Sequence, residues 1–202
     1  MEHTQQLSFL TTVVLIFVSS AFTDNILLAR FLGMCSCLGV SKKVDTSIGL
    51  GIAVMFITAA TAALNYAVSA YILVPLHLEY LRLITFIIVI AAFTQLVEMI
   101  IERFSPSLYN SLGIFLPLIA VNCAILGISL FMLNKPYNFI QTFSFGLGGG
   151  FGWLLAITII GGIRERINEN ALPRGLSGPG ITLIIIGIMS LAFMGFSGMI
   201  KI

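Results

Sequence analysis

Six long apolar runs, separated by short polar breaks, are the feature that most constrains this fold. They lie near residues 8–38, 48–72, 81–101, 111–133, 142–163 and 180–200. A helix needs about 20 apolar residues to cross the hydrocarbon core, so each run is long enough for one crossing. Charged residues are 9% of the chain, against roughly 25% in a soluble domain. The sequence therefore predicts one all-α integral membrane domain, residues 1–202, with six transmembrane helices.

The basic residues predict how these helices are oriented. Segment 1–6 lacks the charged region and cleavage site of a secretory signal, so we expect the first run to be retained. One set of loops carries six basic residues: Lys42, Lys43, Arg103, Arg164, Arg166 and Arg174. The opposite side carries three: Arg82, Lys135 and Lys201. Lys and Arg are enriched in cytoplasmic loops, which places both termini outside. The net charge of +2 gives no indication of a nucleic-acid partner.

One short phrase, C-x-x-L-G-[VI]-S, occurs twice, beginning at Cys35 and again at Cys123. The copies lie in the first and fourth apolar runs and divide the chain into halves of about 8–104 and 108–200. Each half has three spans, and an odd repeat must insert its second copy upside down. We therefore predict two inverted three-helix repeats, whose cysteines approach the middle of the membrane from opposite faces.

Polar residues, Gly and Pro interrupt the first and fourth runs. They are Asp24, Asn25, Gly33, Gly113, Pro117 and Asn122. Proline removes an amide hydrogen and clashes with the preceding turn, so it kinks or splits a helix. Irregular backbone at membrane depth is tolerated only where protein or a cavity satisfies its polar groups. Helices one and four are therefore predicted to be interrupted around a site.

The residues alone leave three interpretations of Cys35 and Cys123. Free cysteines are often small buried hydrophobic residues, but matched positions beside two helix breaks weaken that interpretation. A disulfide is the second, although such bonds belong mainly to oxidising compartments. The third is a metal site: iron–sulfur clusters are generally held by four Cys, so these two would be half of a ligand set shared with another chain. Amide groups at broken helices would offset the anionic charge.

Cys37 has no counterpart in the second phrase, where Ile125 stands, so we predict that it packs in the interior. The glycine-rich run 146–152 opens an apolar span and follows no strand. It therefore predicts close helix packing, and not a dinucleotide-binding turn.

Few polar groups at membrane depth are available for ion transport. Glu98 lies near the inner end of the third run, where a carboxylate often marks an ion route. The alternative is an interfacial carboxylate paired with Arg103 or with a neighbouring subunit. Asp24 and Asn25 either cap a helix break or line a conduction route. Asn122, next to Cys123, is expected to support the surroundings of the thiols.

Several motifs resemble one family, and together they cover nearly the whole chain. They are the segments 31–43, 108–124, 162–166 and 193–198. These resemble the membrane subunits of Rnf complexes and of Na⁺-translocating NADH:quinone reductases (Nqr). Segments 74–82 and 189–198 look more like the A subunit of Rnf, whereas 152–157 and 172–176 are similar to the E subunit of Nqr.

The resemblance implies a function and a cofactor. It implies a membrane subunit of an ion-translocating oxidoreductase of the Rnf, ferredoxin:NAD⁺ type, in a bacterial or archaeal cytoplasmic (inner) membrane. Cys35 and Cys123 would hold half of a 2Fe-2S cluster that relays electrons across the membrane, coupled to Na⁺ or H⁺ transport. The chain departs from the usual pattern at Ser36 and Cys37.

The resemblance also implies partners. A paralogous six-helix subunit of opposite topology, similar to the E subunit of Rnf or the D subunit of Nqr, would hold the other half of the cluster. Other subunits of the complex would carry flavins and further iron–sulfur clusters. The alternative functions are the E subunit of Nqr and, from a different class, an inverted-repeat secondary transporter in which the thiols only pack.

Overall fold

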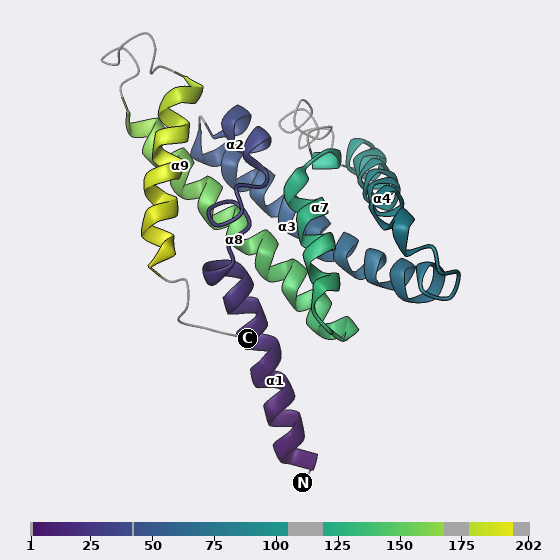
Figure 1. Ribbon diagram of the computed structural model, residues 1–202. Helices are drawn as coiled ribbons and strands as arrows, with labels where there is room; N and C mark the ends of the chain where they lie inside the picture. Colours follow the sequence, from purple (N-terminus) through teal and green to yellow (C-terminus); the bar gives the residue numbers. More distant parts are fainter. Residues whose placement is uncertain (1, 42, 105–118, 168–177, 196–202) are drawn as a thin grey trace.

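The computed structural model describes residues 2–41, 43–104, 119–167 and 178–195. These residues form helices joined by short connections and contain no strand, so the predicted all-α class is confirmed (Figure 1). The α-helices are α1 (Glu2–Val18), α2 (Met34–Val40), α3 (Val44–Val68), α4 (Arg82–Phe104), α7 (Cys123–Phe131), α8 (Phe139–Arg166) and α9 (Pro179–Met194). π-Helical turns Ser19–Thr23 and Ser69–Leu73 extend α1 and α3, and 3₁₀ turns Glu79–Leu81 and Met132–Asn134 precede α4 and follow α7.

Three helical segments are long and apolar enough to cross a membrane. They are Val44–Leu73, Glu79–Arg103 and Phe139–Arg166, which match three of the predicted spans. Three shorter apolar helices, Ser8–Thr23, Cys123–Asn134 and Pro179–Met194, match parts of the other three. Gly113 and Pro117, predicted to interrupt the fourth span, lie outside the described residues.

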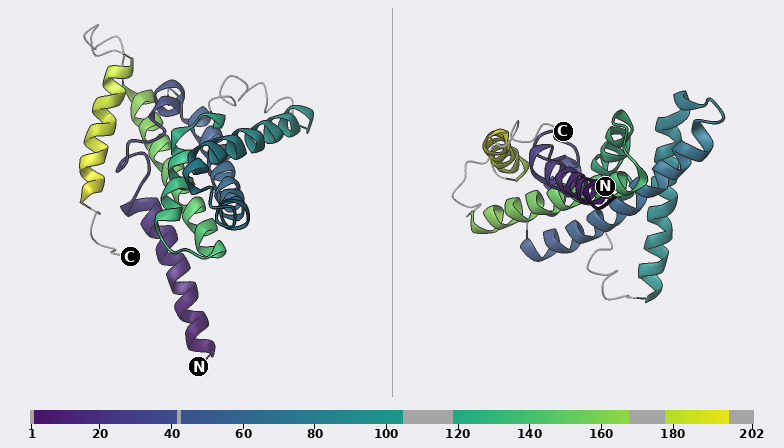
Figure 2. Two further views of the ribbon diagram at one scale, coloured as in Figure 1. Left: turned by 45° about the vertical axis from the view of Figure 1, so that its right-hand side comes forward. Right: turned by 90° about the horizontal axis from the view of Figure 1, so that it is seen from below.

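Helix α8 is the centre of the fold, because its glycines let two neighbours approach closely. A Cβ added at Gly146 or Gly150 would lie 2.7 Å from an atom of Ala62 or Met55 on α3. A Cβ at Gly148 would lie 2.6 Å from the carbonyl oxygen of Phe17 on α1. Figure 2 shows α3 lying along α8, and only the C-terminal part of α1 lies against α8. The glycine run therefore serves helix packing, as the sequence predicts.

The first apolar run is broken between Thr23 and Met34, as predicted, and Asn25 caps the break. Its Nδ2 donates to the carbonyl oxygens of Ala21 at 3.0 Å and Gly152 at 2.8 Å. Its Oδ1 accepts from the backbone N–H groups of Leu27 at 3.1 Å and Leu28 at 3.2 Å. One buried amide thus satisfies backbone groups that would otherwise be orphaned within the membrane.

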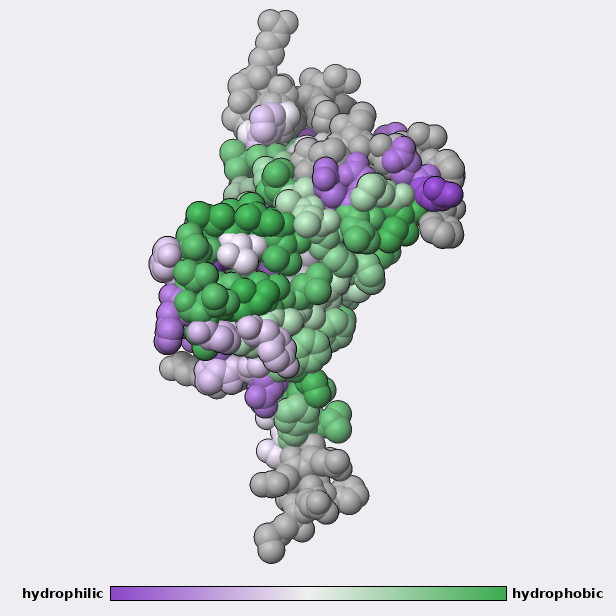
Figure 3. Space-filling view, turned by 90° about the vertical axis from the view of Figure 1, so that its right-hand side faces the viewer, coloured by the Kyte–Doolittle hydropathy of each residue, from purple (hydrophilic) through white to green (hydrophobic). Residues whose placement is uncertain are grey.

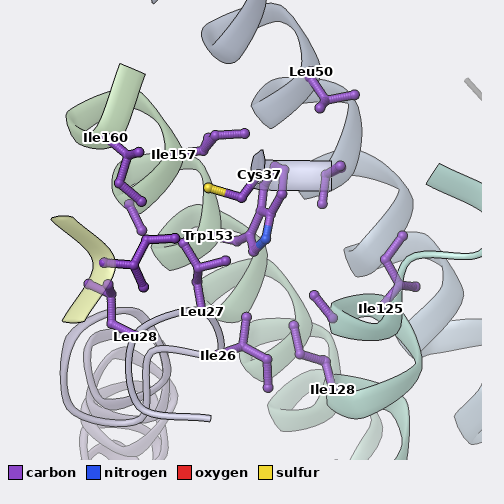
Figure 4. Packing of buried hydrophobic residues seen from close by; sticks show 14 of the residues in the cluster. Ile26, Leu27, Leu28, Cys37, Leu50, Ile125, Ile128, Trp153, Ile157 and Ile160 are labelled. Carbon is purple, nitrogen blue, oxygen red and sulfur yellow. The ribbon is translucent and has the colours of Figure 1, made fainter. Parts of the chain in front are cut away.

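The first part of the broken segment is held in the interior of the protein. Ile26, Leu27 and Leu28 are buried and belong to the main apolar core (Figure 4). Ser190 of α9 donates its hydroxyl to the carbonyl oxygen of Leu28 at 2.7 Å. The backbone of residues 25–28 is therefore covered by protein, as is required of such backbone at membrane depth, whereas Ala29, Arg30 and Phe31 are exposed.

The outer surface is apolar over much of its area. Figure 3 shows a broad hydrophobic face on the side where α4 lies, with hydrophilic residues gathered near its two ends. Helix α4 contributes exposed apolar side chains: Leu83, Ile84, Ile87, Ile88, Leu96, Met99 and Ile100. Such a face suits lipid or neighbouring membrane proteins and not water.

Candidate functional site

The backbone just before the first cysteine phrase contacts the cysteine of the second phrase. The backbone N–H of Gly33 donates to the Sγ of Cys123 at 2.9 Å. Cys35 follows Gly33 by two residues, which span at most about 7 Å. The backbone of Cys35, from the first half of the chain, therefore lies near Cys123, from the second half.

Both cysteines occupy the first turn of a short helix that follows a break. Cys123 is the first residue of α7 and Cys35 the second residue of α2. Asn122 caps α7, because its Oδ1 accepts from the N–H of Ala124 at 3.0 Å. Free amide groups at a helix N-terminus carry positive partial charge, which suits an anionic group bound beside it.

Gly33 is required at this contact for two separate reasons. Its φ of +81° lies in the left-handed region, which side chains other than glycine rarely adopt. An added Cβ would lie 2.5 Å from Trp153 Nε1, 2.9 Å from the Ala124 Cβ and 3.1 Å from Asn122 Oδ1. The start of α2 can therefore approach the start of α7 only because this residue has no side chain.

Asn122 and Ser36 join the two helices beside the thiols. The Nδ2 of Asn122 donates to Ser36 Oγ at 3.3 Å, and that hydroxyl donates to the carbonyl oxygen of Gly33 at 3.1 Å. Both side chains are buried. Asn122 thus connects the start of α7, next to Cys123, to Ser36 in the first half of the chain.

The three cysteines differ in exposure. Cys35 is exposed and Cys123 is partly exposed, whereas Cys37 is buried. Figure 4 shows Cys37 within the core beside Trp153. Cys37 therefore packs in the interior as predicted, while the two cysteines of the repeated phrase reach the surface of the chain.

Cys35 and Cys123 are free thiols that could serve as two ligands of a metal group. Across the described ranges, no group of three or more His, Cys, Asp or Glu residues gathers around one point. Two thiols at the surface would supply part of the ligand set of a metal group, and the remaining ligands would come from outside the described residues. Trp153 Nε1, buried next to Gly33, has no hydrogen-bond acceptor among the described residues, so it is a spare donor beside the site.

An apolar pocket of about 290 Å³ adjoins Cys123. Its walls come from α4 and from the start of α7: Ile87, Ile90, Ala91, Ala120, Val121, Asn122, Cys123 and Leu126. Cys123 therefore borders an apolar hollow at the surface of the chain.

Asp24 lies between two pockets. It pairs with Arg30 at 3.6 Å, and the guanidinium of Arg30 stands 4.9 Å from the centre of the Phe131 ring. Asp24 and Arg30 together line pockets of about 210 Å³ and 310 Å³. The amide nitrogen and oxygen of Asn25 make hydrogen bonds to four backbone groups of the chain. Asp24 is therefore the more available of the two side chains for contact with an ion.

Glu98 is half-buried on α4. Within the part of the chain that the structure describes, the ion pairs are Asp24 with Arg30 and Glu79 with Arg82. The alternative pairing of Glu98 with Arg103 is therefore not formed here. The carboxylate remains a candidate for an ion route.

Ser36 and Trp153 are residues of the site that the sequence does not predict. Ser36 occupies a variable position of the repeated phrase and gives no signal of its own. Trp153 is the single Trp of the chain and lies within an apolar run. A lone polar indole at membrane depth is the available signal.

These features define an all-helical membrane protein with a pair of surface thiols held at two helix breaks. Residues 13–200 match the family described as "Rnf-Nqr subunit, membrane protein". The chain belongs to this family.

Curated relatives of two kinds are similar to the chain over almost their whole length. The A subunit of the Na⁺-translocating ferredoxin:NAD⁺ oxidoreductase complex of Acetobacterium woodii is 50% identical over 188 residues, 93% of this chain and 98% of the relative. The E subunit of the Na⁺-translocating NADH-quinone reductase of Maridesulfovibrio salexigens is 50% identical over 196 residues, 92% of this chain and 97% of the relative. The protein of the same name from Azotobacter vinelandii is 49% identical over 193 residues, which are 91% of this chain and 96% of the relative.

Proposed function

We propose that this chain is a membrane subunit of an ion-translocating oxidoreductase complex of the Rnf, ferredoxin:NAD⁺ type, in the cytoplasmic membrane. The names of the relatives support the class of complex. The E subunit of an NADH:quinone reductase is the second candidate, because the identity to relatives of both kinds is 50%. The segments 74–82 and 189–198 favour the Rnf type.

Cys35 and Cys123 are proposed as two ligands of a 2Fe-2S cluster, which accepts and passes on single electrons. The observation that carries this proposal is the hydrogen bond from Gly33 N–H to Cys123 Sγ, which brings Cys123 next to the backbone two residues before Cys35. An N–H group that donates to a ligand sulfur helps to set the reduction potential of a cluster bound to that sulfur. The hydrogen bond between Asn122 and Ser36 would fix the position of Cys35 relative to Cys123.

The remaining two ligands are proposed to come from a paralogous six-helix subunit of opposite topology. The exposure of Cys35 and the apolar pocket beside Cys123 support a partner at this surface. Two inverted repeats within this chain, with both termini outside, belong to the same proposal. The matched cysteine phrases after two helix breaks support the repeats.

Ion transport is proposed to involve Asp24 and Glu98, with Na⁺ or H⁺ as the ion. Asp24 borders two pockets, and Glu98 is a half-buried carboxylate on an apolar helix without an ion-pair partner in the described residues. Carboxylates in such surroundings are costly and often functional. Asn25 would act by shaping the break beside Asp24.

The test is the metal content and spectrum of the complex purified from its native membrane. We expect iron and the absorbance of a 2Fe-2S cluster, and loss of that signal with the coupled activity in either Cys35→Ser or Cys123→Ser. Cys37→Ser is the matched control and should retain the signal. If both single variants keep the spectrum and transport, the secondary-transporter alternative is favoured. The identity of the co-purified proteins decides between the Rnf and Nqr types.

A further inference from the structure

The last turn of α8 makes hydrogen bonds to the end of α2 and to the start of α3. Arg164 is buried, with 6% of its surface exposed. Its Nη1 donates to Ser41 Oγ at 2.9 Å and to the carbonyl oxygen of Leu38 at 3.4 Å. Both acceptors lie at the C-terminal end of α2, the helix that carries Cys35.

The next residue contacts the start of α3. Glu165 Oε2 accepts a hydrogen bond from the backbone N–H of Val44 at 3.3 Å, and Val44 is the first residue of α3. One turn earlier, Gly161 packs so tightly on Ser47 that an added Cβ would lie 2.8 Å from the Ser47 hydroxyl. The end of α8 therefore meets the end of one helix and the start of the next.

The charges of these two residues match the helix ends that they contact. The C-terminal carbonyls of a helix carry negative partial charge and favour a cation, whereas the N-terminal amides favour an anion. Arg164 faces the end of α2 and Glu165 faces the start of α3, so exchanging them would oppose both interactions. A buried guanidinium costs desolvation energy, which only specific hydrogen bonds offset. This cost argues that Arg164 has a definite positional role.

We propose that Arg164 and Glu165 form a clamp: they are positioning residues that set the placement of α2 and thereby of Cys35. Gly33 and Ser36 attach the beginning of α2 to α7. Arg164 supplies a second attachment at the opposite end. A short helix held at both ends keeps Cys35 at a constant position relative to Cys123. The consequence for a bound cluster rests on the proposed function, whereas the positioning of the thiols does not.

Two readouts test this proposal. The first is the extent of cross-linking between Cys35 and Cys123 by a short bifunctional thiol reagent, measured on the full chain made under iron limitation in a Cys37→Ala background. The second is the spectrum and midpoint potential of the cluster in the assembled complex. The variants are Arg164→Gln, Arg164→Lys and Glu165→Gln. Arg166→Gln, which removes an exposed cation from the same turn, is the matched control.

We expect Arg164→Gln to change cross-linking several-fold and to shift the potential, Arg164→Lys to recover part of both, and Glu165→Gln to have a smaller effect. Arg166→Gln should match the unchanged chain. If Arg164→Gln does not accumulate, Arg164→Lys and Glu165→Gln decide the outcome. Equal cross-linking and equal potentials in all variants would overturn the clamp while leaving the cluster intact. Altered cross-linking in a complex without iron would support the clamp and refute the cluster.

Discussion

The Nδ2 of Asn122 donates to the Oγ of Ser36 over 3.3 Å, which joins the residue before Cys123 to the residue after Cys35. This bond lies between the two halves of the chain and is buried. It holds two backbone segments together at the point where both helices are broken. Its loss should therefore affect the thiols as well as the stability of the fold.

Asn122→Ala should lower the free energy of unfolding by about 1–3 kcal/mol, because it removes a helix cap and leaves a buried hydroxyl without its donor. Thermal unfolding of the detergent-solubilised protein measures this change. Asn134→Ala, an exposed Asn at the other end of the same helical segment, is the control. Equal losses in both variants would show that the bond to Ser36 contributes nothing specific.

Gly33→Ala should destabilise the protein by at least about 1–2 kcal/mol, the cost of a left-handed backbone for a residue with a side chain. The clash with Trp153 adds to this cost. Gly39→Ala is the control on the same helix, because an added Cβ there meets nothing within 4 Å. Gly39→Ala should be neutral or stabilising by up to about 1 kcal/mol. Unfolding midpoints that fall equally would contradict the role of Gly33.

Gly148→Ala should separate α8 from α1, because the new methyl group would lie 2.6 Å from the backbone oxygen of Phe17. Backbone cannot move aside as easily as a flexible side chain, so we expect a loss of about 1–3 kcal/mol. Gly187→Ala on α9 has open space around it and should be tolerated. The prediction fails if the two variants have the same unfolding midpoint.

Asp24→Asn should reduce ion uptake per electron transferred while leaving the fold nearly intact. The pair with Arg30 is half-exposed, and such pairs contribute about 0–1 kcal/mol to stability. Ion flux and redox turnover measured together in vesicles separate the two effects. Asp45→Asn, a carboxylate in the first turn of α3, is the control. An unchanged ratio of ions to electrons in Asp24→Asn would remove Asp24 from the ion route.

Much of the architecture could be predicted because its signals are local. Apolar runs identify membrane segments wherever they lie, and they located the three long spans directly. Asn25 and Gly33 marked the break in the first helix because polar groups and glycine change the backbone nearby. Proline at 117 gives a similar local signal, but it lies outside the described residues.

The sequence by itself determined the helical membrane class, the broken first helix and the matched pair of thiols, since each follows from residues close together in the chain. Only the tertiary structure decided that Gly33 contacts Cys123 and that Arg164 holds the end of α2. Lipid is as apolar as the side chains of a membrane helix, so hydrophobic pattern does not show which face meets a neighbour. Those contacts depend on close packing and on hydrogen bonds between residues far apart in sequence, and these are settled only when the helices come together.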